Sequence, residues 1–317
     1  MQLTPAHIAR LRTLPGFADL DDEELDRLTG RSQVAVWRDG EPILRKGAPS
    51  ETMHVLVAGA ARVALPSAED GGRSVLLNDG AVFGEIGMLS GEPRTADVLA
   101  VGDCETLVLR RADVEPLLWD HPRLARVLTN LVRKRLRRSG ELVRVGKYRL
   151  LEQIGQGSSS DVYEGVHEAL GRTVAIKMLS HTLAYDRPLL SRFLNEARII
   201  ASLEHPNIVR VHDTEAAFAT HFIVMERLRG SDLQRVLAER RRLTASEVCA
   251  LLGQAVSALC FAHGHGVVHG DVKPANCGVG LDGRLKLMDF GLTTRLDGPR
   301  ATDLEGLIVG TPRYMAP

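Results

Sequence analysis

Residues 267–276, with the sequence VVHGDVKPAN, place a histidine, an aspartate, a lysine and an asparagine close together. Asp271 has the chemistry to accept a hydroxyl proton or orient an attacking oxygen, and Lys273 can neutralise a phosphoryl group in transfer. Asn276 offers an amide oxygen to magnesium. A polar turn after a helix explains the same residues equally well, so this stretch alone does not decide between the two.

Other residue types that suit phosphate chemistry occur before and after this stretch. Gly155 and Gly157 fall in a turn between strands, and Lys177 lies in the next strand, where it can hold phosphates. Glu196, on the following helix, can fix that lysine by an ion pair, and Asp289 in LKLMDFGL can bridge magnesium and phosphate oxygens. Each residue taken singly is more often a surface charge or an ordinary turn. Their order along the chain favours a nucleotide-phosphate site.

The first half contains a second group of this kind, in FGEIGMLSGEPRTADV, residues 83–98. Gly84 and Gly87 can leave their backbone amides accessible to a ligand, and Glu85 can accept a hydrogen bond from a sugar hydroxyl. The planar guanidinium of Arg94 suits a phosphate. An exposed turn glutamate and a surface arginine are the simpler explanations of each residue alone. Together they predict a site for a phosphorylated sugar.

The pattern of apolar and polar residues predicts the elements that position these groups. Short strands separated by glycine-rich turns run from about residue 32 to 109, as in an antiparallel barrel or sandwich, with helices on both sides. The later helix, in residues 121–138, ends in basic residues that complement its dipole; the alternatives are contact with a phosphate or with the acidic groove of the second half. From residue 148, a small strand-rich part precedes a mostly helical one, and ligands commonly bind in such a seam. The stripe on the later helix is Leu124, Val127, Leu128 and Leu131.

Composition limits the classes of protein that remain. With 317 residues, 44% of them hydrophobic and 25% charged, the chain has material for about two domains. Its 40 basic and 40 acidic residues cancel, so we expect neither nucleic acid nor membrane as a partner. Four widely spaced cysteines suit packing roles in a reducing compartment. The most apolar stretch, residues 251–263, is short and interrupted, so a cytoplasmic location is predicted.

Residues 148–317 resemble a eukaryotic-type serine/threonine protein kinase of the kind found in bacteria. The matching stretches follow the family's order: IGQGSSSDVYEG, VAIK, Glu196 in FLNEARIIASLEHPNIV, HGDVKPAN, DFG and GTPRYMAP. The resemblance implies ATP and Mg²⁺ as ligands and a protein hydroxyl as the phosphoryl acceptor. Lys273 and Thr311 match the pattern of serine/threonine kinases, and nothing favours tyrosine.

The resemblance also implies residue roles. Met225 is the gatekeeper, and Glu226 to Leu228 form the adenine-binding hinge. The implied catalytic residues are Asp271, Lys273, Lys177 and Glu196, and the implied metal ligands are Asn276 and Asp289. The implied ATP-binding residues are Ile154, Gly155, Gln156, Gly157, Ser158, Ser160, Val162, Ala175, Lys177, Met225, Glu226 and Leu228.

Three positions depart from the family pattern. Ser160 stands where the third glycine of the loop is usual, which the family tolerates. Gly270 replaces the arginine that pairs with a phosphorylated activation loop in relatives, so control by that phosphate is not expected. The sequence ends at Pro317, before the helices that complete the larger lobe and its peptide platform. We expect a fragment of a longer kinase; the alternative is a shortened protein that binds nucleotide without efficient transfer.

Residues 8–138 resemble a cyclic-nucleotide-binding domain, with residues 83–98 as its phosphate-binding cassette. The resemblance implies that Glu85 binds the ribose 2′-hydroxyl and Arg94 the cyclic phosphate. Gly84, Thr95 and Ala96 would add backbone or hydroxyl contacts. A threonine after the arginine occurs in cGMP-selective relatives, but bacterial cAMP binders also carry a hydroxyl there, and we favour cAMP. The apolar stripe of the later helix would close over the base, pack on the barrel, or pack on a second copy in a homodimer.

The predicted fold is therefore multidomain. An N-terminal β-barrel or jelly-roll cyclic-nucleotide-binding domain with flanking helices occupies residues 1–140, and a linker covers 141–147. An α+β bilobal kinase fold covers 148–317, with a β-rich small lobe and hinge at 148–228 and an incomplete helical lobe at 229–317. The predicted function is a serine/threonine kinase regulated by a cyclic nucleotide. The alternatives are a catalytically weak ATP-binding pseudokinase or signalling scaffold and, less favoured, a transcription regulator.

Overall fold

The structure, a computed structural model, describes most of the chain in two compact units. The first unit comprises Met1–Glu141 together with Ser180–Asp186 and Ala216–His221, and the second comprises Leu142–Leu179, Arg187–Glu215 and Phe222–Pro317. The two-domain fold class is confirmed. The predicted residues Ser158 and Thr311 lie outside the described part. The described residues are 3–14, 17–18, 20–64, 74–91, 93–136, 144–157, 160–290, 294–295 and 312–314.

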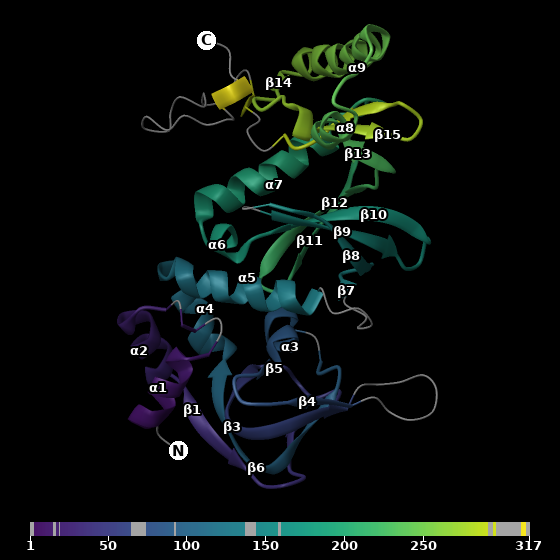
Figure 1. Ribbon diagram of the computed structural model, residues 1–317. Helices are drawn as coiled ribbons and strands as arrows, with labels where there is room; N and C mark the ends of the chain where they lie inside the picture. The colour runs from purple at the N-terminus through teal and green to yellow at the C-terminus, as the bar shows by residue number, and fades with distance from the viewer. Residues whose placement is uncertain are drawn as a thin grey trace. The chain divides into compact units, whose positions relative to one another are not determined.

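The first unit is built on a six-stranded antiparallel sheet (Figure 1). Its main path is β1-β6-β3-β4, and β2 pairs with β6 while β5 pairs with β3. Gly59 lies at the second of two register shifts of β3, with a φ of +86°, and a Cβ there would meet the Asp103 carbonyl oxygen at 2.7 Å. The elements are α1 (Pro5–Arg12), α2 (Asp22–Gly30), β1 (Gln33–Trp37), β2 (Pro42–Leu44), β3 (Thr52–Ala64), β4 (Ser74–Leu77), β5 (Val82–Phe83), α3 (Glu85–Ser90), β6 (Asp97–Arg110), α4 (Arg111–Asp120), α5 (Pro122–Leu136) and α6 (His181–Ala184).

Helix ends and faces in the first unit follow the local sequence. Asp21 caps α2, and its side chain and that of Glu24 bond each other's backbone amides in a capping box. On α5, Leu124, Val127 and Leu128 are all buried, which leaves packing within the first unit as their observed role. The short helix α3 follows Gly84 inside the predicted cassette and had not been predicted from the sequence.

The second unit contains a six-stranded sheet in the order β11-β12-β10-β9-β8-β7, followed in the chain by helices and a three-stranded sheet, β13-β15-β16. β7 pairs with β8, so part of the predicted linker is a strand. The elements are β7 (Arg144–Val145), β8 (Tyr148–Gln156), β9 (Ser160–His167), β10 (Arg172–Leu179), α7 (Arg187–Ala201), β11 (Val211–Ala217), β12 (Thr220–Glu226), β13 (Gly230–Asp232), α8 (Leu233–Arg240), α9 (Ala245–Gly264), β14 (Val267–Val268), η1 (Pro274–Asn276), β15 (Cys277–Gly280), β16 (Leu285–Leu287), β17 (Thr294–Arg295) and η3 (Pro312–Tyr314).

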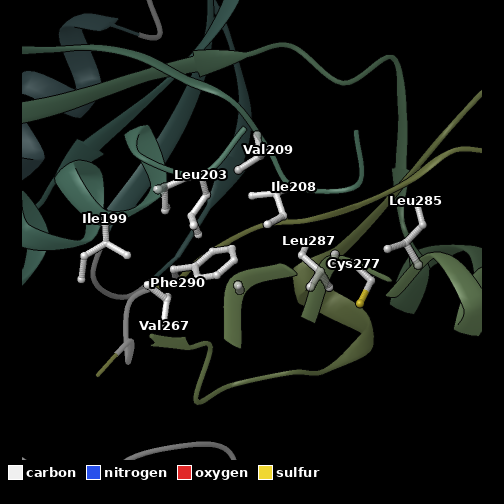
Figure 2. Close-up of a cluster of buried hydrophobic side chains, with 12 residues drawn as sticks. Ile199, Leu203, Ile208, Val209, Val267, Cys277, Leu285, Leu287 and Phe290 are labelled. Atoms are coloured by element: carbon white, nitrogen blue, oxygen red, sulfur yellow. The ribbon is translucent and has the colours of Figure 1, made fainter. Parts of the chain in front are cut away.

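A core of buried side chains joins α7, α9 and the strands after them (Figure 2). Leu287 at the end of β16 and Phe290 are both fully buried in it, on either side of Asp289 in the chain. Ile199 and Leu203, from α7 and the chain after it, lie beside the Phe290 ring (Figure 2). The core therefore holds residues on both sides of Asp289 and leaves the aspartate exposed between them.

Two sequence predictions need correction here. The cysteines were assigned packing roles, which holds for buried Cys104 and Cys277, whereas Cys249 and Cys260 on α9 are exposed and all four are free. The apolar stretch that we predicted to be too short for a membrane span belongs to helix α9. This helix has 20 residues and, by length and composition alone, is long and apolar enough to cross a membrane. One helix of this kind is weak evidence for a membrane protein, and Ala258 of α9 is fully buried in the core.

Candidate functional site

An open cleft of about 1510 Å³ lies in the second unit. One wall comes from β8, β9 and β10, and the opposite wall from the segment after β12, from η1 and from β15. Gln156, Gly157, Asp271 and Lys273 are described but do not line it. The predicted residues that do line it are Ile154, Gly155, Ser160, Val162, Ala175, Lys177, Glu196, Met225, Glu226, Leu228, Asn276 and Asp289.

The pairing of β10 places an apolar pocket next to a charged one. Ala175 pairs with Met225 of β12, and Lys177 pairs with Val162 of β9. Because alternate residues of a strand share a face, Ala175 and Lys177 point the same way into the cleft. The cleft can therefore take a flat apolar ring beside Ala175 and an anion beside Lys177.

Lys177 joins two carboxylates that are far away in the sequence. Its Nζ lies 3.2 Å from Glu196 Oε1 and 2.5 Å from Asp289 Oδ1. The lysine and Glu196 side chains are largely buried, whereas about half of the Asp289 side chain is exposed. Asp289 has a left-handed φ of +63°, an unfavourable conformation for a residue with a side chain. The surrounding core must hold this conformation, and it aims the carboxylate at Lys177.

The electrostatics of this cluster keep the lysine charged. Burial by itself lowers the pKa of Lys177, but the charges of Asp289 and Glu196 outweigh burial and raise it. Burial raises the pKa of Glu196 despite the opposing effect of Lys177. For Asp289, burial is outweighed by the charge and hydrogen bond of Lys177, so its pKa is lowered. A permanent cation beside an exposed carboxylate suits a polyphosphate that carries a divalent ion.

The loop that precedes η1 is held together by its own polar side chains. Lys273 Nζ lies 2.6 Å from Asp271 Oδ2. Asn276 Nδ2 donates to the Asp271 carbonyl oxygen at 2.8 Å and to its Oδ2 at 3.1 Å. Gly270 has a left-handed φ of +79°, which glycine adopts without the strain of a larger residue. The sequence placed these three side chains together, and the structure shows them in direct contact.

His269 connects this loop to the segment that carries Asp289. Its Nε2 donates to the Met288 carbonyl oxygen at 3.0 Å, and its Nδ1 accepts from the Asp271 amide at 3.3 Å. The side chain is 1% exposed and burial lowers its pKa, so the neutral ring with a proton on Nε2 fits both bonds. The sequence analysis assigned His269 no role, although its place two residues before Asp271 was a usable signal.

Two ion pairs hold the predicted hinge. Glu226 Oε1 accepts from Lys286 Nζ at 2.6 Å and from the Arg210 amide at 2.8 Å. Arg227 donates from Nε to Glu164 Oε2 at 2.7 Å and from Nη1 to the Leu228 carbonyl oxygen. Nothing in the spacing of these charges identifies them as partners, so the sequence analysis missed both pairs.

The first unit has its own pocket, of about 680 Å³. Apolar side chains from β3, β4 and β5 line it together with all five residues predicted to bind a cyclic nucleotide. Gly84 has a left-handed φ of +77°, and a Cβ there would meet Arg94 Nη1 at 2.8 Å. The five predicted residues in the lining are Gly84, Glu85, Arg94, Thr95 and Ala96.

Arg94 is anchored beside this pocket. Nη1 donates to the Gly84 carbonyl oxygen at 2.7 Å, and Nη2 donates to the Thr52 carbonyl oxygen at 2.5 Å and to its hydroxyl at 3.1 Å. Burial lowers the pKa of Arg94, partly offset by Glu85 and Glu51. Arginine remains protonated in proteins, so the pocket contains a fixed positive charge near the Glu85 carboxylate.

Comparisons with known proteins agree with this geometry. The family model of the protein kinase domain matches residues 148–317. The chain belongs to the protein kinase family. A second family model, of the cyclic nucleotide-binding domain, matches residues 35–121. The part of the chain outside these two matches includes α1, α2, the whole of α5 and β7.

Several bacterial kinases are similar to this chain. Serine/threonine-protein kinase PknA of Mycobacterium tuberculosis is 38% identical over 177 residues, covering 54% of this chain and 41% of the relative. Serine/threonine-protein kinase Pkn1 of Myxococcus xanthus is 37% identical over 225 residues, covering 69% of this chain and 31% of the relative. The chain thus spans less than half the length of these curated relatives. The bacterial type of kinase inferred from the sequence is confirmed.

Proposed function

We propose that this protein is a serine/threonine kinase that transfers the γ-phosphoryl group of ATP to protein hydroxyls, at a rate set by cAMP or cGMP. The observation that carries the proposal is the cluster of Lys177, Glu196 and Asp289 beside an apolar pocket. It supplies a fixed cation and a carboxylate within 2.5 Å of each other at the edge of an open cleft. That arrangement suits a nucleoside triphosphate better than an uncharged ligand.

The residues of the loop that precedes η1 act on the hydroxyl group that accepts the phosphoryl group. Asp271 orients the acceptor hydroxyl and receives its proton on a carboxylate oxygen as the hydroxyl oxygen bonds to the γ-phosphorus. The bond from the γ-phosphorus to the bridging β-phosphate oxygen breaks in the same transfer, and ADP leaves. Asn276 holds that carboxylate by a bond to Oδ2, and Lys273 lies beside the same oxygen. His269 bonds to both the Asp271 amide and the Met288 carbonyl oxygen, and so fixes the position of Asp271 relative to the segment that carries Asp289. Charge stabilisation and positioning supply most of the catalysis expected of such a site.

The donor set also suits a magnesium ion. Met288 N donates to the Asn276 carbonyl oxygen at 2.9 Å, so Asn276 and Asp289 lie on neighbouring segments. Both side chains carry hard oxygen atoms, which Mg²⁺ prefers, and the Asp289 side chain is 49% exposed toward the open cleft. Among the described residues no three His, Cys, Asp or Glu side chains gather as a metal site, which fits an ion shared with substrate phosphates. Bound there, Mg²⁺ would neutralise charge on the β- and γ-phosphates.

The pocket of the first unit supports the regulatory part of the proposal. Arg94 and Glu85 both line this pocket, which supports our assignment of the cyclic phosphate to Arg94 and of the ribose hydroxyl to Glu85, and the apolar strand residues can cover a base. We favour cAMP as the effector and place the protein in the cytoplasm with a protein substrate. A second copy of the chain remains a candidate partner.

Transfer is tested with Asp271→Asn in the full-length protein, using radiolabelled ATP, Mg²⁺ and dephosphorylated casein. The amide keeps the shape of the side chain but cannot take the proton, so we expect the transfer rate to fall by at least about 100-fold, within the range for general acid–base catalysis. ATP binding by calorimetry should stay within about 3-fold, because the loss falls on the transition state. Asp282→Asn, in the exposed turn between β15 and β16, is the matched control.

Equal transfer by the Asp271 and Asp282 variants would refute the catalytic assignment. ATP binding by the wild-type protein without any transfer would show a nucleotide-binding scaffold instead. Regulation is tested in the same assay by adding saturating cAMP or cGMP, and unchanged rates with both would refute that part of the proposal.

A further inference from the structure

Two short segments of the kinase sequence belong to the first compact unit. They are Ser180–Asp186, which contains α6, and Ala216–His221, which contains the turn between β11 and β12. Both pack among helices of the cyclic-nucleotide-binding sequence, and α6 lies beside α5 (Figure 1). Ordinary packing between sequence neighbours does not explain this, because α5 and α6 are separated by four strands.

The contact with α5 is polar and fully buried. Thr129 of α5 is 2% exposed and His181 of α6 is 0% exposed. The Thr129 hydroxyl accepts from the His181 amide at 2.9 Å and lies 3.1 Å from His181 Nδ1. Buried polar groups are costly to leave unpaired, so these two residues hold α5 and α6 in one register.

The other side of His181 reaches the turn. Its Nε2 lies 2.6 Å from the Phe218 carbonyl oxygen, which can only accept, so Nε2 carries the proton and donates it. The next residue of the turn, Ala219, donates its amide to the Leu89 carbonyl oxygen of α3 at 3.1 Å. Phe218 and Ala219 have left-handed φ angles of +51° and +54°. Neither is glycine, so the surrounding contacts must hold this strained turn in place.

The contact with α3 is the important one, because α3 is part of the cassette. Glu85 and Gly87 of α3 line the predicted cyclic-nucleotide pocket, and Leu89 lies at the other end of the same short helix. Arg111 of α4 donates to the Gly87 carbonyl oxygen at 3.3 Å and to that of Met88. A shift of α3 on ligand binding therefore acts directly on the turn and on α4.

The packing around the turn leaves room for such a shift. A pocket of about 390 Å³, open to solvent, is lined by residues of α3 and α4 together with Tyr185 and Ala219. Trp119 of α4 packs edge-on against Tyr185, with ring centroids 5.1 Å apart. Close-packed interfaces move between discrete arrangements rather than deforming continuously, and a partly unfilled one has space for a second arrangement.

We infer that α3, α5, α6 and the turn at Phe218 and Ala219 form a coupling joint that passes the state of the cyclic-nucleotide pocket to the ATP site. The inference rests on the proposed function. The chain leaves α6 and enters α7 at Arg187, and α7 carries Glu196, the partner of Lys177. After the turn at Phe218 and Ala219 the chain enters β12, which ends in Met225 and Glu226. Both exits from the joint are thus direct backbone connections to residues that line the ATP cleft.

Thr129→Val tests the joint in the full-length protein, since it keeps the shape of the side chain and removes the hydroxyl. Thr129→Ser keeps the hydroxyl. Thr29→Val is the matched control, because Thr29 is also buried in a helix, where its hydroxyl donates to the Leu25 carbonyl oxygen at 2.8 Å. Three quantities are measured: the ratio of casein phosphorylation rates with and without saturating cAMP or cGMP, the Kd of each nucleotide, and hydrogen exchange in peptides covering residues 180–186 and 216–221.

We expect the wild-type, Thr129→Ser and Thr29→Val proteins to share one rate ratio, which for allosteric coupling is about 5- to 150-fold. In Thr129→Val the ratio should fall to within about 2-fold of unity, while the nucleotide Kd measured without ATP stays within about 3-fold, because the joint couples sites and does not build the pocket. In the wild-type protein the nucleotide should change exchange in both segments.

The outcomes separate the joint from the proposed function. A wild-type response that Thr129→Val retains in full, with exchange in both segments unaltered by nucleotide, would overturn the joint and leave the regulated kinase intact. A wild-type protein whose rate responds to neither nucleotide would overturn the proposed regulation, and the joint with it.

Discussion

The ion pair between Lys286 and Glu226 gives the sharpest prediction about the hinge. Lys286 Nζ donates to Glu226 Oε1 at 2.6 Å and to the Ile208 carbonyl oxygen at 3.4 Å. The two side chains are 13% and 28% exposed. A hydrogen bond to a charged group contributes about 1.5–3 kcal/mol, and partial exposure of Glu226 lowers this to about 1–2 kcal/mol. Lys286→Met keeps the length of the side chain and removes both bonds.

We expect this change to weaken ATP binding more than it slows transfer. Since about 1.4 kcal/mol corresponds to a tenfold change, loss of the pair should raise the KM for ATP about 5- to 30-fold if the whole effect reaches the hinge. The kcat should stay within about 2-fold, because the two bonds that the change removes go to Glu226 of the hinge and to the Ile208 carbonyl oxygen. Lys286→Arg should restore most of the affinity, because it keeps the charge.

The assay is initial-rate kinetics of casein phosphorylation over a range of ATP concentrations. Lys147→Met serves as the matched control: Lys147 also pairs with an aspartate, Asp213, at 2.7 Å, but its side chain is 53% exposed. Exposed ion pairs contribute little to stability, so the KM of this variant should hardly change. An unchanged KM in Lys286→Met, or a fall in kcat without a rise in KM, would refute the positioning role.

Three further predictions concern the first unit. Arg94→Ala should raise the Kd for cAMP about 10- to 150-fold in calorimetry, the scale of a charged hydrogen bond of about 1.5–3 kcal/mol; unchanged affinity would remove the cassette assignment. Gly84→Ala should also weaken binding, because its φ of +77° and the 2.8 Å approach of Arg94 leave no room for a Cβ; wild-type affinity would contradict this. Burial, and to a smaller extent the charge of Arg94, lowers the pKa of His54 from 6.5 to about 4. Between these two pH values His54 is protonated in the unfolded chain and neutral in the folded one. The free energy of unfolding should therefore fall by up to about 3 kcal/mol as the pH drops from 6.5 to 4, and His54→Gln should flatten this pH dependence. Urea unfolding followed by tryptophan fluorescence measures it, because both tryptophans, Trp37 and Trp119, belong to this unit. Parallel pH dependences for the two proteins would contradict the prediction.

Much of the site was predictable because its chemistry depends on short local patterns. The stretch from His269 to Asn276 is one loop, and its residues meet each other after a few turns of backbone. The cassette from Gly84 to Arg94 is similarly local, and the structure places its ends in direct contact. Strand and helix positions followed from periodicity, apart from short elements such as α3 and α6, which are too brief to show a period.

What the sequence by itself determined was the set of reactive groups and their order: the glycine loop, Lys177, Glu196, Asp271 and Asp289. Only the tertiary structure decided which distant groups meet. The bond from Lys177 to Asp289 spans 112 positions, and the pairs of Lys286 with Glu226 and of Thr129 with His181 span 60 and 52. No spacing rule links such residues, because their proximity results from how whole elements pack once the apolar faces are buried.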